Sequence, residues 1–134
     1  MSEAQQEDKS PGRFSWNECI TSDPEAAKKF YGELFGWTAE TMPMPSGEYT
    51  MFKRGDTPVA GMMKRSEEMT QIPSHWLAYV TVESIEASCA KAEELGGKVM
   101  QPKIDVPEMG SLAVIQDPTG AVISFWEFAN KANT

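Results

Sequence analysis

One pattern of residues occurs twice in this chain, sixty positions apart. The stretch from Trp16 to Trp37 and the stretch from Trp76 to Gly97 align without gaps. Both consist of an apolar strand, an acidic helix start, an apolar helix and a closing glycine. The identical pairs are Trp16/Trp76, Thr21/Thr81, Ala27/Ala87, Glu33/Glu93 and Gly36/Gly96. A fixed offset of this kind indicates two copies of one half-domain, and a pocket between the copies is where we expect function.

The first copy predicts one strand, one helix and three further strands. Ser22 or Asp23 is expected to cap the helix, Pro24 suits its first turn, and Gly36 ends it. One face of this helix is apolar at helical spacing, through Ala27, Phe30, Tyr31 and Leu34. The strands expected after it are Thr38 to Met42, Tyr49 to Arg54 and Pro58 to Lys64, separated by the segments 43–47 and 54–56.

The second copy predicts the same order of elements. The expected elements are a strand from His75 to Val82, a helix from Ser84 to Leu95, and strands from Lys98 to Val106, Ser111 to Gln116 and Ala121 to Phe128. The last two strands are joined by Asp117-Pro118-Thr119-Gly120, which has the composition of a type I turn. Each half therefore reads as βαβββ.

These elements predict an α+β fold of two βαβββ modules related by pseudo-two-fold symmetry. Neither half can bury both faces of a four-stranded sheet, so pairing the two would form an eight-stranded cup. We expect a single domain over residues 13–128, with modules 13–64 and 75–128 and a connector at 65–74. Residues 1–12 and 129–134 are expected to be flexible tails.

The composition excludes several classes of function. Twenty Asp and Glu outnumber twelve Lys and Arg, giving a net charge of -8, so a nucleic-acid partner is not expected. No apolar run approaches the roughly 20 residues of a membrane helix, and the first residues lack the apolar core of a secretory signal. We therefore expect no membrane partner and a cytoplasmic location. Cys19 and Cys89 lie in a predicted strand and a predicted helix, which favours buried thiols over a disulfide or zinc site.

Two motifs carry a family resemblance. Asp23 is followed by Phe30-Tyr31 and Phe35-Gly36, and Asp117-Pro118-Thr119-Gly120 leads into the last strand. In this order, over residues 13–128, the chain resembles the glyoxalase, bleomycin-resistance and extradiol-dioxygenase superfamily, also called vicinal oxygen chelate proteins. Within it, the chain is similar to a branch labelled glyoxalase-like, hydroxylase-like or mycobacterial secreted antigen.

The resemblance implies a cup with one divalent metal held by His and Glu side chains, acting as a Lewis acid. Counting from the family's motifs places the four ligands at Trp16, at Trp76 or Leu77, at Ser124 and at Lys64. None of these is a usual metal ligand, and the chain has a single histidine. The expected cofactor is therefore none, and one divalent metal ion is the alternative.

Strand alternation suggests which residues line the cup instead. The predicted ligand-binding residues are Trp16, Glu18, His75, Leu77, Tyr79, Ser124 and Trp126. Glu18 is also the candidate catalytic residue, because a carboxylate in an apolar strand must be solvated by a cavity, paired or protonated, unless it lies at an exposed edge. More ordinary interpretations remain open: Trp16 as core, His75 as a surface residue and Ser124 as a space-filler.

The leading hypothesis is a glyoxalase-like protein that binds a small hydrophobic or aromatic molecule in its cup without a metal. One alternative is a metal-dependent lyase, isomerase or dioxygenase that uses Glu18 and His75 as replacement ligands. Another is a protein-interaction module. The resemblance also implies a homodimer, with the cup closed either within one chain or by exchange of halves between two chains.

Overall fold

The structure is a computed structural model that describes residues 10–44, 47–66 and 72–129. The chain forms two compact units. The first unit comprises residues 16–77, and the second comprises residues 78–129 together with residues 10–15. Of the predicted segments, residues 1–9 and 130–134 of the tails, 45–46 of the turn and 67–71 of the connector lie outside the described residues.

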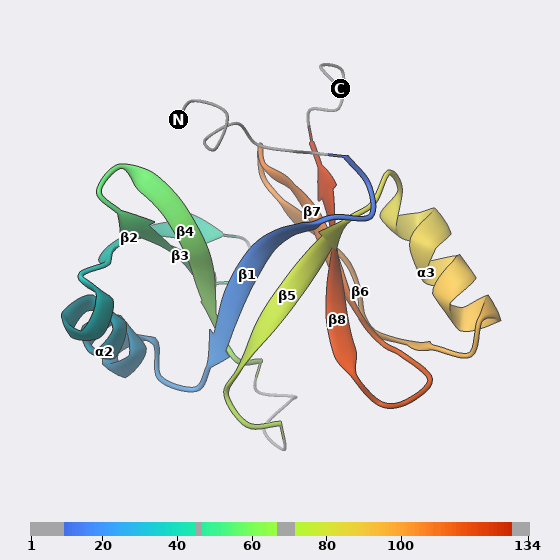
Figure 1. The fold of residues 1–134 in the computed structure, drawn as a ribbon, viewed down its shortest axis with the longest axis horizontal. Helices are drawn as coiled ribbons and strands as arrows, with labels where there is room; N and C mark the ends of the chain where they lie inside the picture. The colour runs from blue at the N-terminus through green and yellow to red at the C-terminus, as the bar shows by residue number, and fades with distance from the viewer. Residues whose placement is uncertain (1–9, 45–46, 67–71, 130–134) are drawn as a thin grey trace. The chain divides into compact units, whose positions relative to one another are not determined.

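The order of elements is βαβββ followed by βαβββ, as the repeat predicts (Figure 1). The elements of the first half are β1 (Phe14–Thr21), α2 (Pro24–Phe35), β2 (Thr38–Met44), β3 (Gly47–Arg54) and β4 (Thr57–Lys64). Those of the second half are β5 (His75–Thr81), α3 (Ile85–Glu94), β6 (Lys98–Val106), β7 (Gly110–Gln116) and β8 (Val122–Phe128). The predicted α+β fold class with two βαβββ modules is therefore confirmed.

The two halves also share one strand topology. In the first half the strands lie in the order β2-β3-β4-β1, with β1 parallel to β4 and the other pairs antiparallel. In the second half the order is β5-β8-β7-β6, with β5 parallel to β8 and the other pairs antiparallel. The internal similarity of the sequence thus extends to the pairing of every strand within each half.

The helix ends follow the local chemistry of the sequence. The Asp23 carboxylate accepts a hydrogen bond from the backbone N–H of Ala26, at 3.1 Å, and Pro24 is the first helical residue of α2. Gly36 ends α2 in the left-handed conformation, with φ of 77°. Ser84 caps α3 in the same way as Asp23 caps α2.

Helix α2 covers one face of the first sheet. A core cluster of Cys19, Phe52, Ala60 and Met62 packs against side chains that include Ala27 and Tyr31 of the helix. The other two members of the predicted apolar face differ from expectation, since Phe30 and Leu34 are 59% and 57% exposed. The apolar stripe that the 3.6-residue spacing predicts on α2 is therefore wider than the part of the helix that packs against the sheet.

Strand β2 is longer than the sequence predicts. It continues through Pro43, opposite Glu48, to Met44, where we expected a break. Proline lacks a backbone N–H, but β2 is the outermost strand of the first sheet, and an edge strand tolerates this loss.

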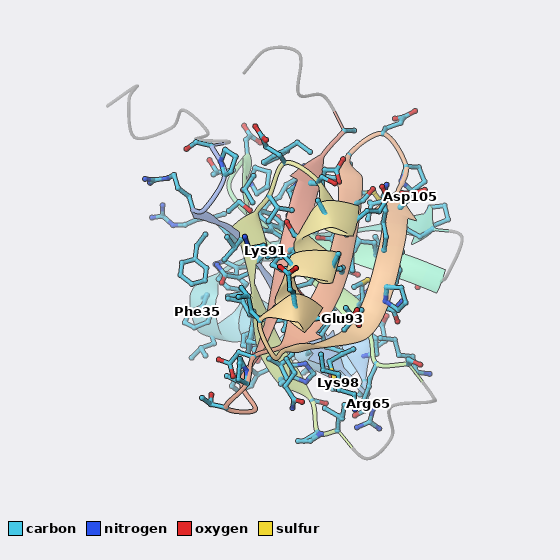
Figure 2. All side chains as sticks on the ribbon, turned by 90° about the vertical axis from the view of Figure 1, so that its right-hand side faces the viewer. Phe35, Arg65, Lys91, Glu93, Lys98 and Asp105 are labelled. Atoms are coloured by element: carbon cyan, nitrogen blue, oxygen red, sulfur yellow. The ribbon has the colours of Figure 1, made fainter. Side chains whose placement is uncertain are left out.

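Helix α3 lies over the second sheet and contacts β6, β7 and β8. Figure 2 shows it in front of these strands, with Lys91 and Glu93 labelled on it. Only Ile85 of this helix is buried, and the Glu127 carboxylate of β8 accepts a hydrogen bond from the Ile85 N–H at 2.8 Å. The second helix is therefore fastened to its sheet at its N-terminal end.

Both cysteines are free thiols. Cys19 is buried as predicted, whereas Cys89 is only half-buried because α3 buries little besides its first residue. Burial, and then the charge of Glu18, raise the pKa of Cys19 above its usual value. Burial, and then the charge of Glu93, raise the pKa of Cys89 as well.

No helix among the described residues is long and apolar enough to cross a membrane.

Candidate functional site

Glu18 lies in the middle of β1, and the register of the first sheet determines its neighbours. It is the parallel partner of Gly61 on β4, and Gly61 is in turn the antiparallel partner of Met51 on β3. Because Cys19 and Met62 face α2, alternation directs Glu18 and Gly61 to the opposite face of the sheet. Tyr49 lies two residues before Met51 and shares that face.

Three side chains on this face form a hydrogen-bonded chain. The indole Nε1–H of Trp16 donates to the Tyr49 hydroxyl oxygen at 2.9 Å. The Tyr49 hydroxyl in turn forms a hydrogen bond to Glu18. Glu18 is 2% exposed and Tyr49 is 5% exposed, whereas Trp16 is only half-buried. We call these residues the Trp16–Tyr49–Glu18 chain. It runs from a partly accessible indole ring to a buried carboxylate.

Gly61 makes room for this chain. A Cβ atom at this position would stand 2.6 Å from Glu18 Oε2 and 2.5 Å from Tyr49 Cζ, and still nearer to the Tyr49 hydroxyl oxygen. Contacts this short do not occur for real Cβ atoms. The absence of a side chain at Gly61 is therefore what lets the tyrosine hydroxyl reach across the sheet to Glu18.

The electrostatics of the Trp16–Tyr49–Glu18 chain keep the Tyr49 hydroxyl protonated. Burial, the negative charge of Glu18 and the hydrogen bond to Glu18 raise the pKa of Tyr49 well above its usual value near 10, and the hydrogen bond from Trp16 only partly opposes this. Tyr49 thus remains a donor to the carboxylate while its oxygen accepts from the indole. Of the options that the sequence left open for Glu18, the structure shows a carboxylate paired with the Tyr49 hydroxyl. Its burial contradicts an exposed edge position.

Three of the predicted ligand-binding residues meet in the second unit. Tyr79 and Trp126 are in edge-to-face contact, with ring centroids 6.3 Å apart, and Tyr79 is the strand partner of Ser124. Ser124 is fully buried, and its Oγ has no hydrogen-bond partner among the described residues. The ring of Trp126 lies against Gly110, where a Cβ would stand 2.7 Å from Trp126 Cζ2.

The remaining two predicted site residues lie at the start of β5. Leu77 is buried, whereas His75 is only half-buried. The Nδ1 atom of His75 is 2.8 Å from the carbonyl oxygen of Pro73, a local contact that holds the ring at the strand's first residue. Trp76 is 42% exposed, and its Nε1–H donates to the Tyr31 hydroxyl at 2.9 Å.

Tyr49 belongs to the Trp16–Tyr49–Glu18 chain and Gly61 makes room for it, but neither was among the predicted site residues. Tyr49 reaches Glu18 only because β4 pairs with β1 as well as with β3, and no local pattern encodes the pairing of β1 with β4. Gly61 did give a signal, because a glycine inside an apolar strand marks a close approach of other atoms.

A family model supplies the identification. The model for the Glyoxalase/Bleomycin resistance protein/Dioxygenase superfamily matches residues 13–125. The chain belongs to this superfamily.

Curated relatives within the superfamily are longer than this chain. "Putative glyoxylase CFP32" of Mycobacterium tuberculosis is 38% identical over 114 residues, covering 84% of this chain and 43% of that protein. Anthracycline biosynthesis protein DnrV of Streptomyces peucetius is 30% identical over 129 residues, covering 87% of this chain and 47% of that protein. The chain thus spans a little less than half the length of these relatives.

Solved structures of the same fold include two methylmalonyl-CoA epimerases. The enzyme from Mycobacterium tuberculosis matches with a TM-score of 0.64 at 11% identity, covering 99% of both chains. A variant of the enzyme from Streptomyces coelicolor, in complex with 2-nitronate-propionyl-CoA, matches with a TM-score of 0.64 at 15% identity, covering 90% of this chain and 96% of that one. At these identities the likeness shows the fold alone.

The superfamily's divalent metal does not fit the side chains at the corresponding positions. Trp16 and Trp76 can only donate through Nε1–H, and both already donate to tyrosine hydroxyls. Leu77 has no donor atom, Lys64 is a cation, and Ser124 offers one neutral hydroxyl. Within residues 10–44, 47–66 and 72–129, no group of three or more His, Cys, Asp or Glu side chains is placed to hold a metal ion.

Proposed function

We propose that this superfamily member binds a small hydrophobic or aromatic molecule, with Trp16 as the contact surface and without a metal. The observation that carries the proposal is the Trp16–Tyr49–Glu18 chain. It stands where the family places its first metal ligand, and it combines a partly accessible aromatic ring with buried polar groups. Sites for small organic ligands are generally built from aromatic surface and a few fixed polar groups.

In this proposal Glu18 is a positioning residue. Its carboxylate is 2% exposed, so it acts on the ligand through its neighbours. By holding the Tyr49 hydroxyl it fixes the oxygen to which the Trp16 indole donates, and so fixes the plane of the ring. A preorganised ring loses little conformational freedom when a flat ligand stacks on it.

Metal analysis separates this proposal from metal-dependent lyase, isomerase or dioxygenase chemistry. Protein purified without chelator is expected to contain far less than one divalent metal per chain. A stoichiometric metal that disappears in both Glu18→Gln and His75→Ala would contradict the proposal and support the alternative ligand pair.

Ligand binding is tested with a neutral aromatic probe, 2-naphthol, by isothermal titration calorimetry. Replacing Trp16 by Leu is expected to weaken binding about tenfold or more, since stacking on an aromatic ring contributes roughly 1 kcal/mol or more. Trp76→Leu, which removes another partly exposed indole of the same unit, serves as the matched control and should change the affinity less than about twofold. Equal losses in both variants would argue against a site at Trp16.

A further inference from the structure

The outer side of α2 presents apolar side chains that the fold of the first unit leaves uncovered. Phe30, Leu34 and Phe35 on the helix are 59%, 57% and 54% exposed, and Trp76 at the start of β5 is 42% exposed. None of the twelve residues of α2 is buried. We call Phe30, Leu34, Phe35 and Trp76 the α2 apolar surface.

This surface is held in place by an aromatic network centred on Tyr31. The Tyr31 ring meets Phe30 and Trp76 edge-on, with centroids 5.1 Å and 5.4 Å away, and stacks with Phe35 at 6.1 Å. The Trp76 indole also donates a hydrogen bond to the Tyr31 hydroxyl. From the inner side, Phe52 contacts the same ring. Rings fixed in this way lose little side-chain entropy when a partner covers them.

The charges beside this surface have a self-complementary order. Lys29 and Glu33 form an ion pair at 3.5 Å, and their side chains are 78% and 72% exposed. Each immediately precedes an exposed apolar residue, Phe30 and Leu34 respectively. If two α2 helices packed antiparallel about a two-fold axis near Tyr31, Lys29 of each copy would face Glu33 of the other. A symmetric interface requires this reciprocity.

We propose that the α2 apolar surface is a docking site for a second copy of this chain. Four side chains that are about half exposed offer roughly 400 Å² per copy, taking about 200 Å² for a whole large side chain. Two copies with their flanking residues would bury about 1,000 Å², the size of a weak reversible interface. This proposal is independent of the ligand site.

The first test is sedimentation velocity on the full chain between about 1 and 200 µM. We expect a reversible dimer with a dissociation constant on the order of 10 µM, the range typical of small interfaces. Phe30→Ser should raise this constant by about a hundredfold, because each dimer loses two aromatic contacts. Phe14→Ser is the matched control: Phe14 is 70% exposed but lies in the second unit, so the constant should stay within about twofold.

The second test uses charge exchange, which separates a specific helix pair from general stickiness. Lys29→Glu alone or Glu33→Lys alone should weaken self-association about tenfold or more, since each places like charges opposite one another. The double variant K29E/E33K should restore it. An equimolar mixture of the two single variants should form heterodimers more readily than either forms homodimers.

Three results would overturn the proposal. A wild-type chain that stays monomeric up to about 200 µM excludes the dimer. A dimer that Phe30→Ser leaves unchanged, or weakens no more than Phe14→Ser does, uses another surface. A dimer whose constant does not respond to the charge exchange, or is not restored in the double variant, does not pack α2 against α2. Circular dichroism confirms that each variant remains folded.

Discussion

Replacing Tyr49 by Phe removes the hydroxyl at the centre of the Trp16–Tyr49–Glu18 chain and leaves the ring in place. The change takes away the acceptor of the Trp16 N–H and the donor to the Glu18 carboxylate. Both bonds lie on a face where Glu18 and Tyr49 are almost fully buried, so water cannot readily replace the lost partner.

The size of the effect follows from these two bonds. A neutral hydrogen bond contributes about 1 kcal/mol to stability, and a bond to a charged group contributes roughly 1.5–3 kcal/mol. Tyr49→Phe should therefore lower the free energy of unfolding by about 2–4 kcal/mol. This is a large share of the roughly 5–15 kcal/mol that stabilises a typical domain.

The assay is urea unfolding followed by circular dichroism, with Tyr31→Phe as the matched control. The Tyr31 hydroxyl also accepts from a tryptophan N–H at 2.9 Å, but its partner Trp76 is 42% exposed, so water can take over. The control should cost less than about 1 kcal/mol. A double-mutant cycle of Tyr49→Phe with Glu18→Gln should show a coupling of about 1–2 kcal/mol, because the charged acceptor strengthens the bond.

Two outcomes would refute the reasoning. If Tyr49→Phe costs no more than Tyr31→Phe, burial does not make the Trp16–Tyr49–Glu18 chain important to stability. If Tyr49→Phe costs the same, within about 0.5 kcal/mol, with and without Glu18→Gln, the Tyr49 hydroxyl does not depend on the charge of Glu18.

Three further predictions concern the same sheet and one turn. Gly61→Ala should destabilise the protein by about 1–3 kcal/mol in urea unfolding, because its Cβ would collide with Tyr49 and Glu18. Above pH 10 the unfolded chain releases the Tyr49 proton, whereas the folded state retains it because its Tyr49 pKa is raised. The free energy of unfolding should therefore fall by up to about 1.4 kcal/mol per pH unit, and it should fall less steeply in Tyr49→Phe. Hydrogen bonds from Thr119 and Ala121 lower the pKa of Asp117 below 3.8, so Asp117→Ala should lower the Tm at neutral pH. The difference in Tm between this variant and the wild type should shrink as the pH falls below about 4.

The parts of the fold that the sequence predicted well are encoded within a few residues. Asp23, Pro24 and Gly36 bound α2 through capping chemistry, and β6 has the predicted limits. The turn at Asp117 is closed by its own carboxylate, which accepts from the Thr119 and Ala121 backbone N–H groups. The repeat added the order of elements, because both halves obey the same local rules.

The periodicity of α2 shows a limit of pattern reasoning. Ala27, Phe30, Tyr31 and Leu34 lie on one side of the helix, but only Ala27 and Tyr31 pack against the core. An apolar stripe indicates burial against something without indicating whether that is the sheet or another surface. Phe30 and Leu34, the part of the stripe that the sheet does not cover, belong to the α2 apolar surface.

The candidate site was only partly predictable, because it depends on contacts between strands as well as on local sequence. Glu18 stood out because a carboxylate in an apolar strand must be solvated, paired or protonated. Trp16 was predicted because it occupies the family's first ligand position. The meeting of Tyr49 with Glu18 depends on two strand pairings, the β3–β4 hairpin and the pairing of β1 with β4, and only the second joins residues far apart in sequence. Long-range register of this kind is fixed by packing and leaves little trace in a single sequence.

The central claim is that Trp16 contacts an organic ligand at the position where the family resemblance places a metal ligand. The indole N–H resonance of Trp16 tests this claim most directly. The chain has four tryptophans, so its nitrogen-15 spectrum should show four such resonances, and Trp16→Phe identifies the one required. We predict that 2-naphthol shifts the Trp16 resonance, whereas one equivalent of paramagnetic Mn²⁺ leaves it sharp. Selective broadening by Mn²⁺, with no response to 2-naphthol, would contradict the account.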